Sequence, residues 1–156
     1  MAISRHLPNG LQAFVDEEDS DLLERARFSR LRKGGVYLAV SHRKRGFFIH
    51  RLIAERKLGR SLTSKEHVDH IDGNTMNNTR VNLRLSTSSQ NQCNRGKSKR
   101  NTTGYKGVTY RNRKWIAQIG LNGKVYYLGV FDSPEEAHEA YKKAAMELHG
   151  TFAKFE

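Results

Sequence analysis

The residues best suited to chemistry lie in three short segments, Val68-Asp69-His70-Ile71-Asp72-Gly73-Asn74, Asn82-Leu83-Arg84 and Gln90-Asn91. A histidine can take a proton from water near neutral pH. A hard cation such as Mg²⁺ prefers oxygen ligands and neutralises the charge that builds on a phosphate under attack. Asp69 and the amide oxygen of Asn91 could supply two such ligands. The residue types therefore favour hydrolysis of a phosphodiester, with His70 as the base.

Two readings of this region compete. Residues 67–94 could simply be an Asn-rich turn between two strands, because Asn and Asp favour turns. Adjacent residues on a strand also point to opposite faces. Asp69 and His70 can therefore flank one site only if the strand end is irregular or if both side chains reach around a scissile phosphate.

The pattern around these residues predicts the elements that position them. Val68 and Ile71 flank polar residues in a strand, and Asp72-Gly73-Asn74 is a strong turn signal. A second short strand follows at 83–85 after an Asn-rich loop. Thr87, with Gln90 three residues later, forms a capping box that opens a helix. The predicted order is strand, loop, strand, helix.

Upstream, the hydrophobic spacing predicts a helix over 14–31 that ends at Gly34-Gly35. A strand over 36–40, a basic turn over 41–46 and a strand over 47–49 form a predicted hairpin. Leu52, Ile53 and Leu58 suit a short helix that ends at Gly59.

At these spacings, Asp-His-Ile-Asp-Gly-Asn, Asn-Leu-Arg and Gln-Asn resemble the HNH homing endonucleases of phages and mobile introns. Three upstream pieces are similar to the N-terminal portion of many phage HNH proteins, namely Val15-Asp16-Glu17-Glu18-Asp19, a Gly-Gly-Val-Tyr strand and His50-Arg51-Leu52-Ile53. The resemblance implies a beta-beta-alpha-metal fold, with His70 as the general base and Asn82 hydrogen-bonded to its ring. It also implies that Asp69 and Asn91 bind one Mg²⁺ or Mn²⁺ ion. Many relatives carry histidine at the position of Asn91, so this is the H-N-N variant.

Two further histidines lie close to these segments. We expect His50 to be a structural or DNA-contacting residue rather than a metal ligand, and His67 to be a surface strand residue.

The last third of the chain has the clearest structural signals. Strands are predicted over 108–110, 115–121 and 125–131, and Asn122-Gly123 is typical of a type I′ hairpin turn. A helix begins after Ser133, with Pro134 at its first position, and ends at Gly150. Its predicted inner stripe is Ala137, Ala140, Tyr141, Ala144, Ala145 and Leu148.

Residues 104–155 resemble the ethylene-response-factor type DNA-binding domain of plants, through Tyr-Lys-Gly-Val, Lys-Trp-Ile-Ala and Tyr-Leu-Gly-Val-Phe. That family lays its sheet into the major groove. Strand alternation turns Trp115 and Ala117 toward the helix, and Gln118 and Gly120 toward DNA. Plant members carry more arginine on this face than this chain does, which favours looser anchoring.

The charge is distributed as expected for a nucleic-acid partner. The net charge is +12, and no Asp or Glu lies between Gly73 and Phe131. A one-sign block of this length suits a polyphosphate. The predicted DNA-binding residues are Arg84, Arg95, Lys97, Lys99, Arg100, Lys106, Thr109, Arg111, Arg113, Lys114, Gln118, Lys124 and Tyr127.

Composition excludes other classes. Cys93 is the only cysteine, which rules out an internal disulfide and a cysteine-based zinc ribbon. No apolar run is long enough to cross a membrane, and the N-terminus lacks the apolar stretch of a signal peptide. We therefore expect a cytoplasmic monomer without membrane contact.

Together these patterns predict an α+β protein with an HNH nuclease domain over 1–93, a basic linker over 94–103 and a DNA-binding domain of three strands and one helix over 104–156. The predicted function is a metal-dependent endonuclease that nicks one strand of double-stranded DNA. The alternative is a non-catalytic, sequence-specific DNA-binding regulator. RNA binding is less favoured, because the chain has no aromatic-rich RNA-recognition signature.

Overall fold

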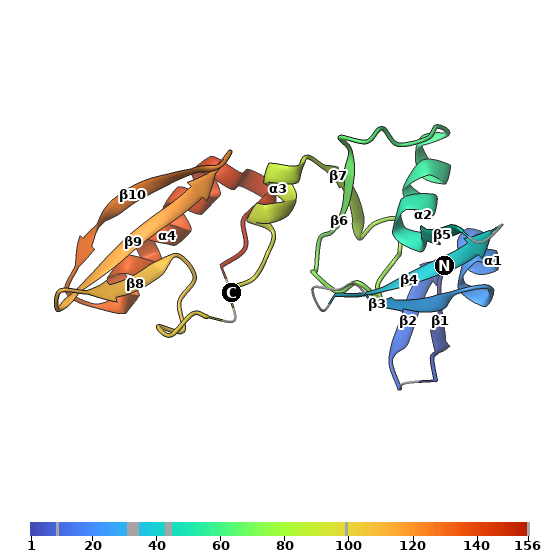
Figure 1. The fold of residues 1–156 in the computed structure, drawn as a ribbon, viewed down its shortest axis with the longest axis horizontal. Coiled ribbons are helices and arrows are strands. Elements are labelled where there is room, and N and C mark those ends of the chain that lie inside the picture. Colours follow the sequence, from blue (N-terminus) through green and yellow to red (C-terminus); the bar gives the residue numbers. More distant parts are fainter. Residues whose placement is uncertain (9, 31–34, 43–44, 99, 156) are drawn as a thin grey trace. The chain divides into compact units, whose positions relative to one another are not determined.

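Sheets in this protein form between strands that follow one another along the chain. The structure, a computed structural model, describes residues 1–8, 10–30, 35–42, 45–98 and 100–155 (Figure 1). Among the strands in these ranges, every ladder joins neighbours in sequence and is antiparallel. The chain divides into two units, Met1–Thr87 and Ser88–Glu156. Each unit combines helices and strands around its own core, in agreement with the predicted α+β class.

The first unit contains three small sheets with short helices between them. Its elements are β1 (Ala2–His6), β2 (Gln12–Asp16), the 3-10 turn η1 (Glu17–Asp19), α1 (Ser20–Glu24), β3 (Arg27–Arg30), β4 (Val36–His42), β5 (Arg45–Phe48), α2 (Ile49–Leu58), β6 (His67–His70) and β7 (Leu83–Ser86). The sheets are β1-β2, β3-β4-β5 and β6-β7. The predicted stop of α2 is confirmed, since its C-cap Gly59 has a φ of 68°, a left-handed conformation that suits glycine.

The core of the first unit draws on nearly every one of these elements. Val15, Leu38, Ile49 and Ile53 each have an exposed fraction of 1% or less. Val68 of β6 and Leu83 of β7 belong to the same cluster. The hairpin that carries the candidate catalytic residues is therefore anchored by burial of apolar side chains, the dominant stabilising term in folding.

The prediction of a helix over 14–31 is wrong. Over 14–30 the chain instead forms the end of β2, η1, the short α1 and β3. Val15 pairs with Ile3 across the β1-β2 hairpin, and β3 pairs with β4. Of the apolar residues whose spacing suggested a helix, only Leu22 and Leu23 lie in α1, so strand pairing outweighed the apparent period. The predicted stop at Gly34 and part of the turn over 41–46 lie outside the described residues.

The second unit is one sheet with a long helix packed along one face (Figure 1). Its elements are α3 (Ser88–Cys93), β8 (Val108–Arg111), β9 (Lys114–Leu121), β10 (Lys124–Phe131), α4 (Pro134–His149) and the 3-10 turn η2 (Gly150–Phe152). The strand order is β10-β9-β8. Ile119 and Ala117 of β9 are buried against residues of α4, among them Ala137 and Tyr141.

Two local signals in this unit are confirmed. Asn122 and Gly123 have φ values of 52° and 77°, as a type I′ turn requires. Ser133 caps α4, because its hydroxyl accepts a hydrogen bond from the backbone N–H of Glu136 at 3.2 Å. Leu148 departs from the predicted inner stripe of the helix, since it is 40% exposed. His149 is buried near that end instead, with its Nε2 donating to the carbonyl of Gly120 at 3.0 Å.

The boundary between the units lies at 87/88, ahead of the predicted domain end at 93. The segment 94–103, predicted as a solvated linker, is partly tied into the second unit. Asn94 is buried, the Asn101 side chain donates to the carbonyl of Tyr105 at 2.7 Å, and the Thr103 hydroxyl donates to that of Val108 at 3.1 Å. Polar side chains here satisfy turn carbonyls, a use that their composition does not reveal. Within the described ranges, no helix has the length and apolarity needed to span a membrane.

Candidate active site and nucleic-acid interface

The candidate catalytic residues lie on the β6-β7 hairpin. Asp69 pairs with Arg84 across the two strands, and His70 pairs with Leu83. Residues directly opposite in an antiparallel pair share a face, and successive residues alternate faces. Asp69 and His70 are nevertheless each only 5% exposed, because His70 is the last residue of β6 and both sides of the strand end are covered.

His70 is held by an asparagine of the following loop. Its Nε2 lies 3.2 Å from Oδ1 of Asn78. The Asn78 amide orients itself by donating from Nδ2 to the carbonyl of Thr75 at 3.2 Å, which turns Oδ1 toward the imidazole. In the neutral ring, Nε2 then carries the hydrogen and Nδ1 carries the lone pair. Burial lowers the pKa of His70, an effect that the hydrogen bond with Asn78 partly offsets. The ring is therefore neutral near pH 7 and able to accept a proton.

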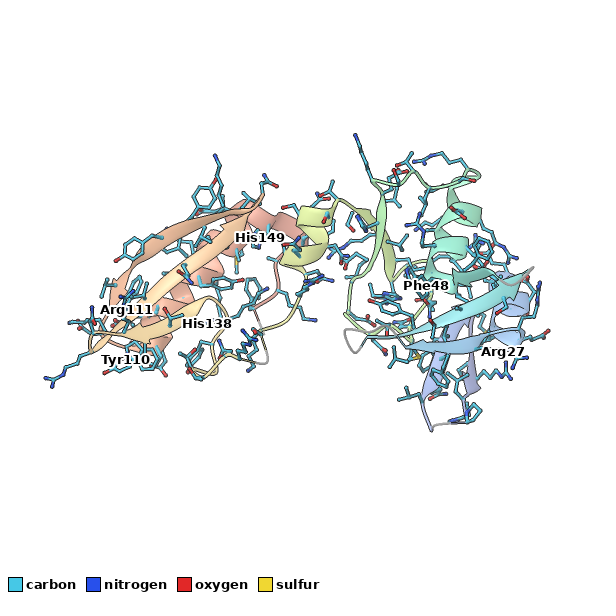
Figure 2. The ribbon with its side chains drawn as sticks, viewed as in Figure 1. Arg27, Phe48, Tyr110, Arg111, His138 and His149 are labelled. Carbon is cyan, nitrogen blue, oxygen red and sulfur yellow. The ribbon has the colours of Figure 1, made fainter. Side chains whose placement is uncertain are left out.

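Other rings enclose the imidazole of His70. The His50 ring lies edge-on to it at 5.3 Å between centroids, and the Tyr37 ring lies at 6.3 Å. Phe48, labelled in Figure 2, stacks on His50 at 5.5 Å. Burial, followed by the electrostatic influence of the neighbouring His70 and Arg51, lowers the pKa of His50 to about 3. His50 is thus a buried neutral residue, and its contact with His70 was not predicted.

The carboxylate of Asp69 is engaged by a cation of its own sheet. Arg84 donates from Nε at 2.9 Å and from Nη2 at 2.8 Å, both to Oδ2 of Asp69. The side chain of Asp69 is 6% exposed and that of Arg84 is 16% exposed. Arg84 was predicted to contact DNA, but its guanidinium is directed at Asp69, because the strand register places the two residues opposite each other.

Asn82 has a different role from the one the resemblance implied. Its Nδ2 donates to Oδ1 of Asp72 at 2.9 Å and to the carbonyl of Asn77 at 2.7 Å, and its Oδ1 accepts from the backbone of Asp72 at 3.1 Å. Asn82 therefore closes the loop between β6 and β7, and Asn78 is the amide that contacts His70. The loop folds back on itself, and this brings Asn78 to the His70 ring and turns the Asn82 side chain toward Asp72 and Asn77.

The N-terminal hairpin anchors this loop. The backbone N–H of Asn78 donates to the carbonyl of Phe14 at 2.8 Å. The backbone N–H of Arg80 donates to Asp16 at 2.6 Å, and its guanidinium Nε donates to the fully buried Asp19 at 2.8 Å. Asp16 at the end of β2 and Asp19 of η1 thus bind the loop between β6 and β7. The sequence contained a signal for this, namely carboxylates upstream and an isolated arginine within the loop.

Asn91, the second predicted metal ligand, lies on α3 in the second unit. Ser89 and Cys93 hold that helix against the sheet of the same unit: the Ser89 hydroxyl accepts from the backbone of Asn122 at 3.1 Å, and the Cys93 carbonyl accepts from Lys106 at 2.9 Å. Each unit is defined by itself, so joint ligation by Asp69 and Asn91 stays a prediction. Within the described ranges, no three His, Cys, Asp or Glu side chains gather as a metal cluster would require.

The sheet of the second unit has one covered face and one open face. Thr109, Arg111 and Gln118 are exposed on the open face, as predicted, and Tyr127 is 65% exposed there. Figure 2 shows Arg111 beside Tyr110 at the end of β8. The arrangement can present side chains to a groove while α4 covers the other face.

Three of the predicted DNA-binding lysines have partners within their own unit. Lys106 donates to the carbonyls of Cys93 and Lys154, both at 2.9 Å, and its burial lowers its pKa. It is therefore not part of the open face. Lys114 forms an ion pair with Asp132, and Lys97 donates to the carbonyl of Gly104 at 3.0 Å. The remaining cationic candidates of the second unit are exposed, namely Arg95, Arg100, Arg111, Arg113 and Lys124, whereas Lys99 lies outside the described residues.

Comparison with known proteins matches both units to families. The HNH endonuclease family model matches residues 47–93, and the AP2 domain model matches residues 103–151. An uncharacterized HNH endonuclease of Acanthamoeba polyphaga mimivirus is 39% identical over 106 residues, which are 68% of this chain and 53% of that protein. Protein 3.8 of Escherichia phage T7 is 35% identical over 91 residues, which are 57% of this chain and 74% of that protein.

A further relative is a plant protein. An AP2-like ethylene-responsive transcription factor of Arabidopsis thaliana is 45% identical over 53 residues, which are 31% of this chain and 10% of that protein. The chain therefore spans about half the length of the mimivirus protein and a small part of the plant protein. No solved structure matches the chain.

Proposed function

Since this chain belongs to the HNH endonuclease family, we propose that it is a metal-dependent endonuclease that hydrolyses phosphodiester bonds of double-stranded DNA. The observation that carries the proposal is the state of His70. Its imidazole is buried, is neutral near pH 7 and has one nitrogen bound by Asn78. A histidine held in this way next to a carboxylate is suited to general-base catalysis.

The donor set fits a hard divalent cation such as Mg²⁺ or Mn²⁺. Asp69 offers carboxylate oxygens and Asn91 an amide oxygen, which are the ligand types that such ions prefer. With so few protein ligands the ion would keep several waters and bind weakly without DNA. The guanidinium of Arg84 is a competitor for Asp69, because it already neutralises the carboxylate that the cation would use. When bound, the cation would supply positive charge beside the scissile phosphate.

The residues of the chain itself then have separate roles in the hydrolysis. The imidazole of His70 accepts a proton from the attacking water, and the contact between its Nε2 and Asn78 fixes the ring for that step. Asn78 keeps the ring in one orientation during that transfer, and Asn82 keeps the loop closed through Asp72. The surrounding rings of Tyr37 and His50 limit access of other water to the imidazole. We infer that the fold around these residues is the beta-beta-alpha-metal arrangement, which β6, β7 and α3 would supply in that order.

One HNH motif per chain provides one active site, so we propose that a monomer nicks a single strand. The second unit would supply affinity for DNA, because its AP2 match and its exposed cationic side chains both favour a duplex partner. Cleavage would then lie at a fixed distance from the bound site.

Supercoiled plasmid provides the direct test. In Mg²⁺ or Mn²⁺ the protein should convert supercoiled DNA to the open circle, and EDTA should stop the reaction. The His70→Ala variant should nick at least about 100-fold more slowly, since general-base catalysis contributes at least that factor. His67→Ala is the matched control, because it removes an imidazole from the same strand, and it should nick like the wild-type protein.

Two outcomes would contradict the proposal. Equal nicking by wild type and His70→Ala would show that the activity comes from another residue or a contaminant. Tight duplex binding with no nicking in any divalent metal would favour the alternative, a DNA-binding regulator that kept an HNH fold.

A further inference from the structure

We propose that the open face of the β8-β10 sheet selects A·T over G·C base pairs through the major groove. This selectivity rests on the proposed DNA endonuclease function and names the class of sequence that it would act on. The residues that carry it are Gln118 of β9 and three apolar residues of β10, Val125, Tyr127 and Val130.

The strand register places these four side chains on one face. Gln118 lies opposite Tyr127, Gly120 lies opposite Val125, and Ile116 opposite Val130. Directly opposed residues share a face, and residues 116, 118 and 120 of β9 share one by alternation. This face is the one that α4 leaves open, since the intervening residues Ala117 and Ile119 are buried.

A β-bulge is needed for this arrangement. The pairing of β9 with β10 shifts register between Tyr127 and Gly129, so Leu128 is the extra residue. Without the shift, Tyr127 and Val130 would point to opposite faces, because they are an odd number of residues apart. The bulge therefore brings an additional apolar side chain to the open face.

The exposure of these apolar side chains is typical of a binding surface. Val125 is 69% exposed, Tyr127 is 65% exposed and Val130 is 49% exposed. Contiguous exposed apolar side chains on a small unit mark a binding surface. Charge identifies the partner as a polyanion. The sheet itself holds no carboxylate and carries Arg111, Arg113 and Lys124 at its ends, whereas the acidic residues Glu135, Glu136, Glu139 and Glu147 lie on α4.

The side-chain chemistry matches A·T pairs. A glutamine amide can donate to N7 and accept from the amino group of adenine at the same time, and apolar side chains contact the methyl group of thymine. Guanine is read by guanidinium or ammonium groups, which bind its two acceptors. At Thr109, Gly120 and Val125 this face offers no such group. Arg111 is its single guanidinium within the three strands, and the ammonium of Lys114, opposite Arg111, is paired with Asp132.

Gly120 contributes by having no side chain. Its position opposite Val125 leaves the hairpin end of the central strand without a side chain, and a Cβ there would lie 3.8 Å from the carbonyl of Lys124, an ordinary contact. The fold therefore does not require glycine at this position. Close approach of the backbone to base edges is a reason to have it.

Binding of the full chain to fluorescent duplexes, in EDTA so that no cleavage occurs, tests the proposal. A duplex of only A·T pairs should bind at least about 10-fold more tightly than a G·C duplex of equal length, since a good base contact is worth roughly 5- to 150-fold. Replacing thymine by uracil should weaken binding about fourfold for each methyl contacted. Replacing N7 of adenine by carbon should weaken it roughly tenfold, by leaving the Gln118 amide without an acceptor.

Variants add a second line of test. Gln118→Ala and Val125→Ser should each reduce A·T binding and leave G·C binding unchanged. Both positions are exposed, so the fold should persist, and the base analogues test the wild-type protein in any case. Lys124→Ala is the matched control, because loss of a phosphate contact should weaken both duplexes equally.

Three outcomes would overturn the proposal. Equal affinity for the two duplexes, or tighter G·C binding, would contradict the selectivity. An A·T preference that survives both base replacements would come from groove shape instead of contacts with base edges. A concentration-dependent dimer that Tyr127→Ser dissociates would show that a second copy covers this face. Failure of the proposed function is distinguishable, because it appears as loss of plasmid nicking whatever the base preference.

Discussion

Replacing Arg84 by methionine should expose the competition between a guanidinium and a metal ion for Asp69. Methionine keeps much of the side-chain volume and removes the charge. Arg84 makes two hydrogen bonds to one oxygen of a carboxylate that is 5% exposed. The variant therefore leaves a buried negative charge without this cation, and the folded first unit should lose stability.

The expected loss follows from burial. Breaking a buried ion pair costs about 3–5 kcal/mol, and the 16% exposure of the Arg84 side chain favours the lower end, about 3 kcal/mol. In a unit of this size each kcal/mol lowers the Tm by about 4–8 °C, so the fall should be roughly 12–24 °C. Mg²⁺ at ten times its Kd should return about 1.4 kcal/mol to the variant, by binding the folded state alone.

Thermal unfolding followed by circular dichroism, in EDTA and in Mg²⁺, measures both effects. The wild-type protein should respond less to Mg²⁺ than Arg84→Met does, because the ion must first displace the guanidinium. The double variant Asp69→Asn, Arg84→Met is the control. It has no buried charge to compensate, so it should be more stable than Arg84→Met in EDTA and insensitive to Mg²⁺.

Two results would refute this reasoning. A Tm for Arg84→Met within a few degrees of the wild type would mean that the ion pair contributes little. An equal rise in Tm with Mg²⁺ for the wild type, Arg84→Met and the double variant would mean that the ion binds somewhere other than Asp69.

Three further predictions concern single side chains. Asn78→Ala should slow nicking roughly tenfold, because it removes the acceptor of an imidazole N–H. It should also move the acid limb of the pH–rate profile to lower pH, because the lost hydrogen bond raises the pKa of His70 in the wild type. An acid limb that does not move would contradict this. His50→Phe should flatten the pH dependence of stability, measured by urea unfolding. Between pH 6.5 and about 3 the unfolded chain binds a proton at His50 that the folded chain does not, so wild-type stability falls as the pH drops through this range. An identical slope in both proteins would disprove the lowered pKa of His50. Gly107→Ala should destabilise the second unit by about 3 kcal/mol, because its φ is +75° and the new Cβ would overlap an aromatic ring of α4. Gly104→Ala, at a φ of +79° in open space, should cost only about 1 kcal/mol in the same thermal unfolding assay, and equal costs would show that the ring is not the cause.

The sequence predicted those parts of the fold that depend on local chemistry. The turn at Asn122-Gly123 and the cap at Ser133 were correct because each is decided by the residue's own backbone preference or by a bond three residues away. The strand, loop, strand, helix order around His70 was correct for the same reason, since Asp72 and Gly73 form a tight turn on their own.

The sequence failed where distant segments decide the outcome. Nothing local distinguishes Asn78 from Asn82 as the partner of His70, because that choice depends on how the loop folds back. The pairing of Asp69 with Arg84 depends on strand register, which a residue pattern this short does not fix. Lys106 was predicted to contact DNA, whereas its long side chain donates to the carbonyls of Cys93 and Lys154.

The attachment of the loop between β6 and β7 to the N-terminal hairpin limits how this chain can be shortened or transplanted. The family match begins at residue 47, yet the loop is held by Phe14, Asp16 and Asp19, far upstream of that point. A fragment that starts at the match would keep every residue of the motif and lose the bonds that shape it. A transfer of the motif into another chain should therefore succeed only where β1 and β2 are transferred together with His70.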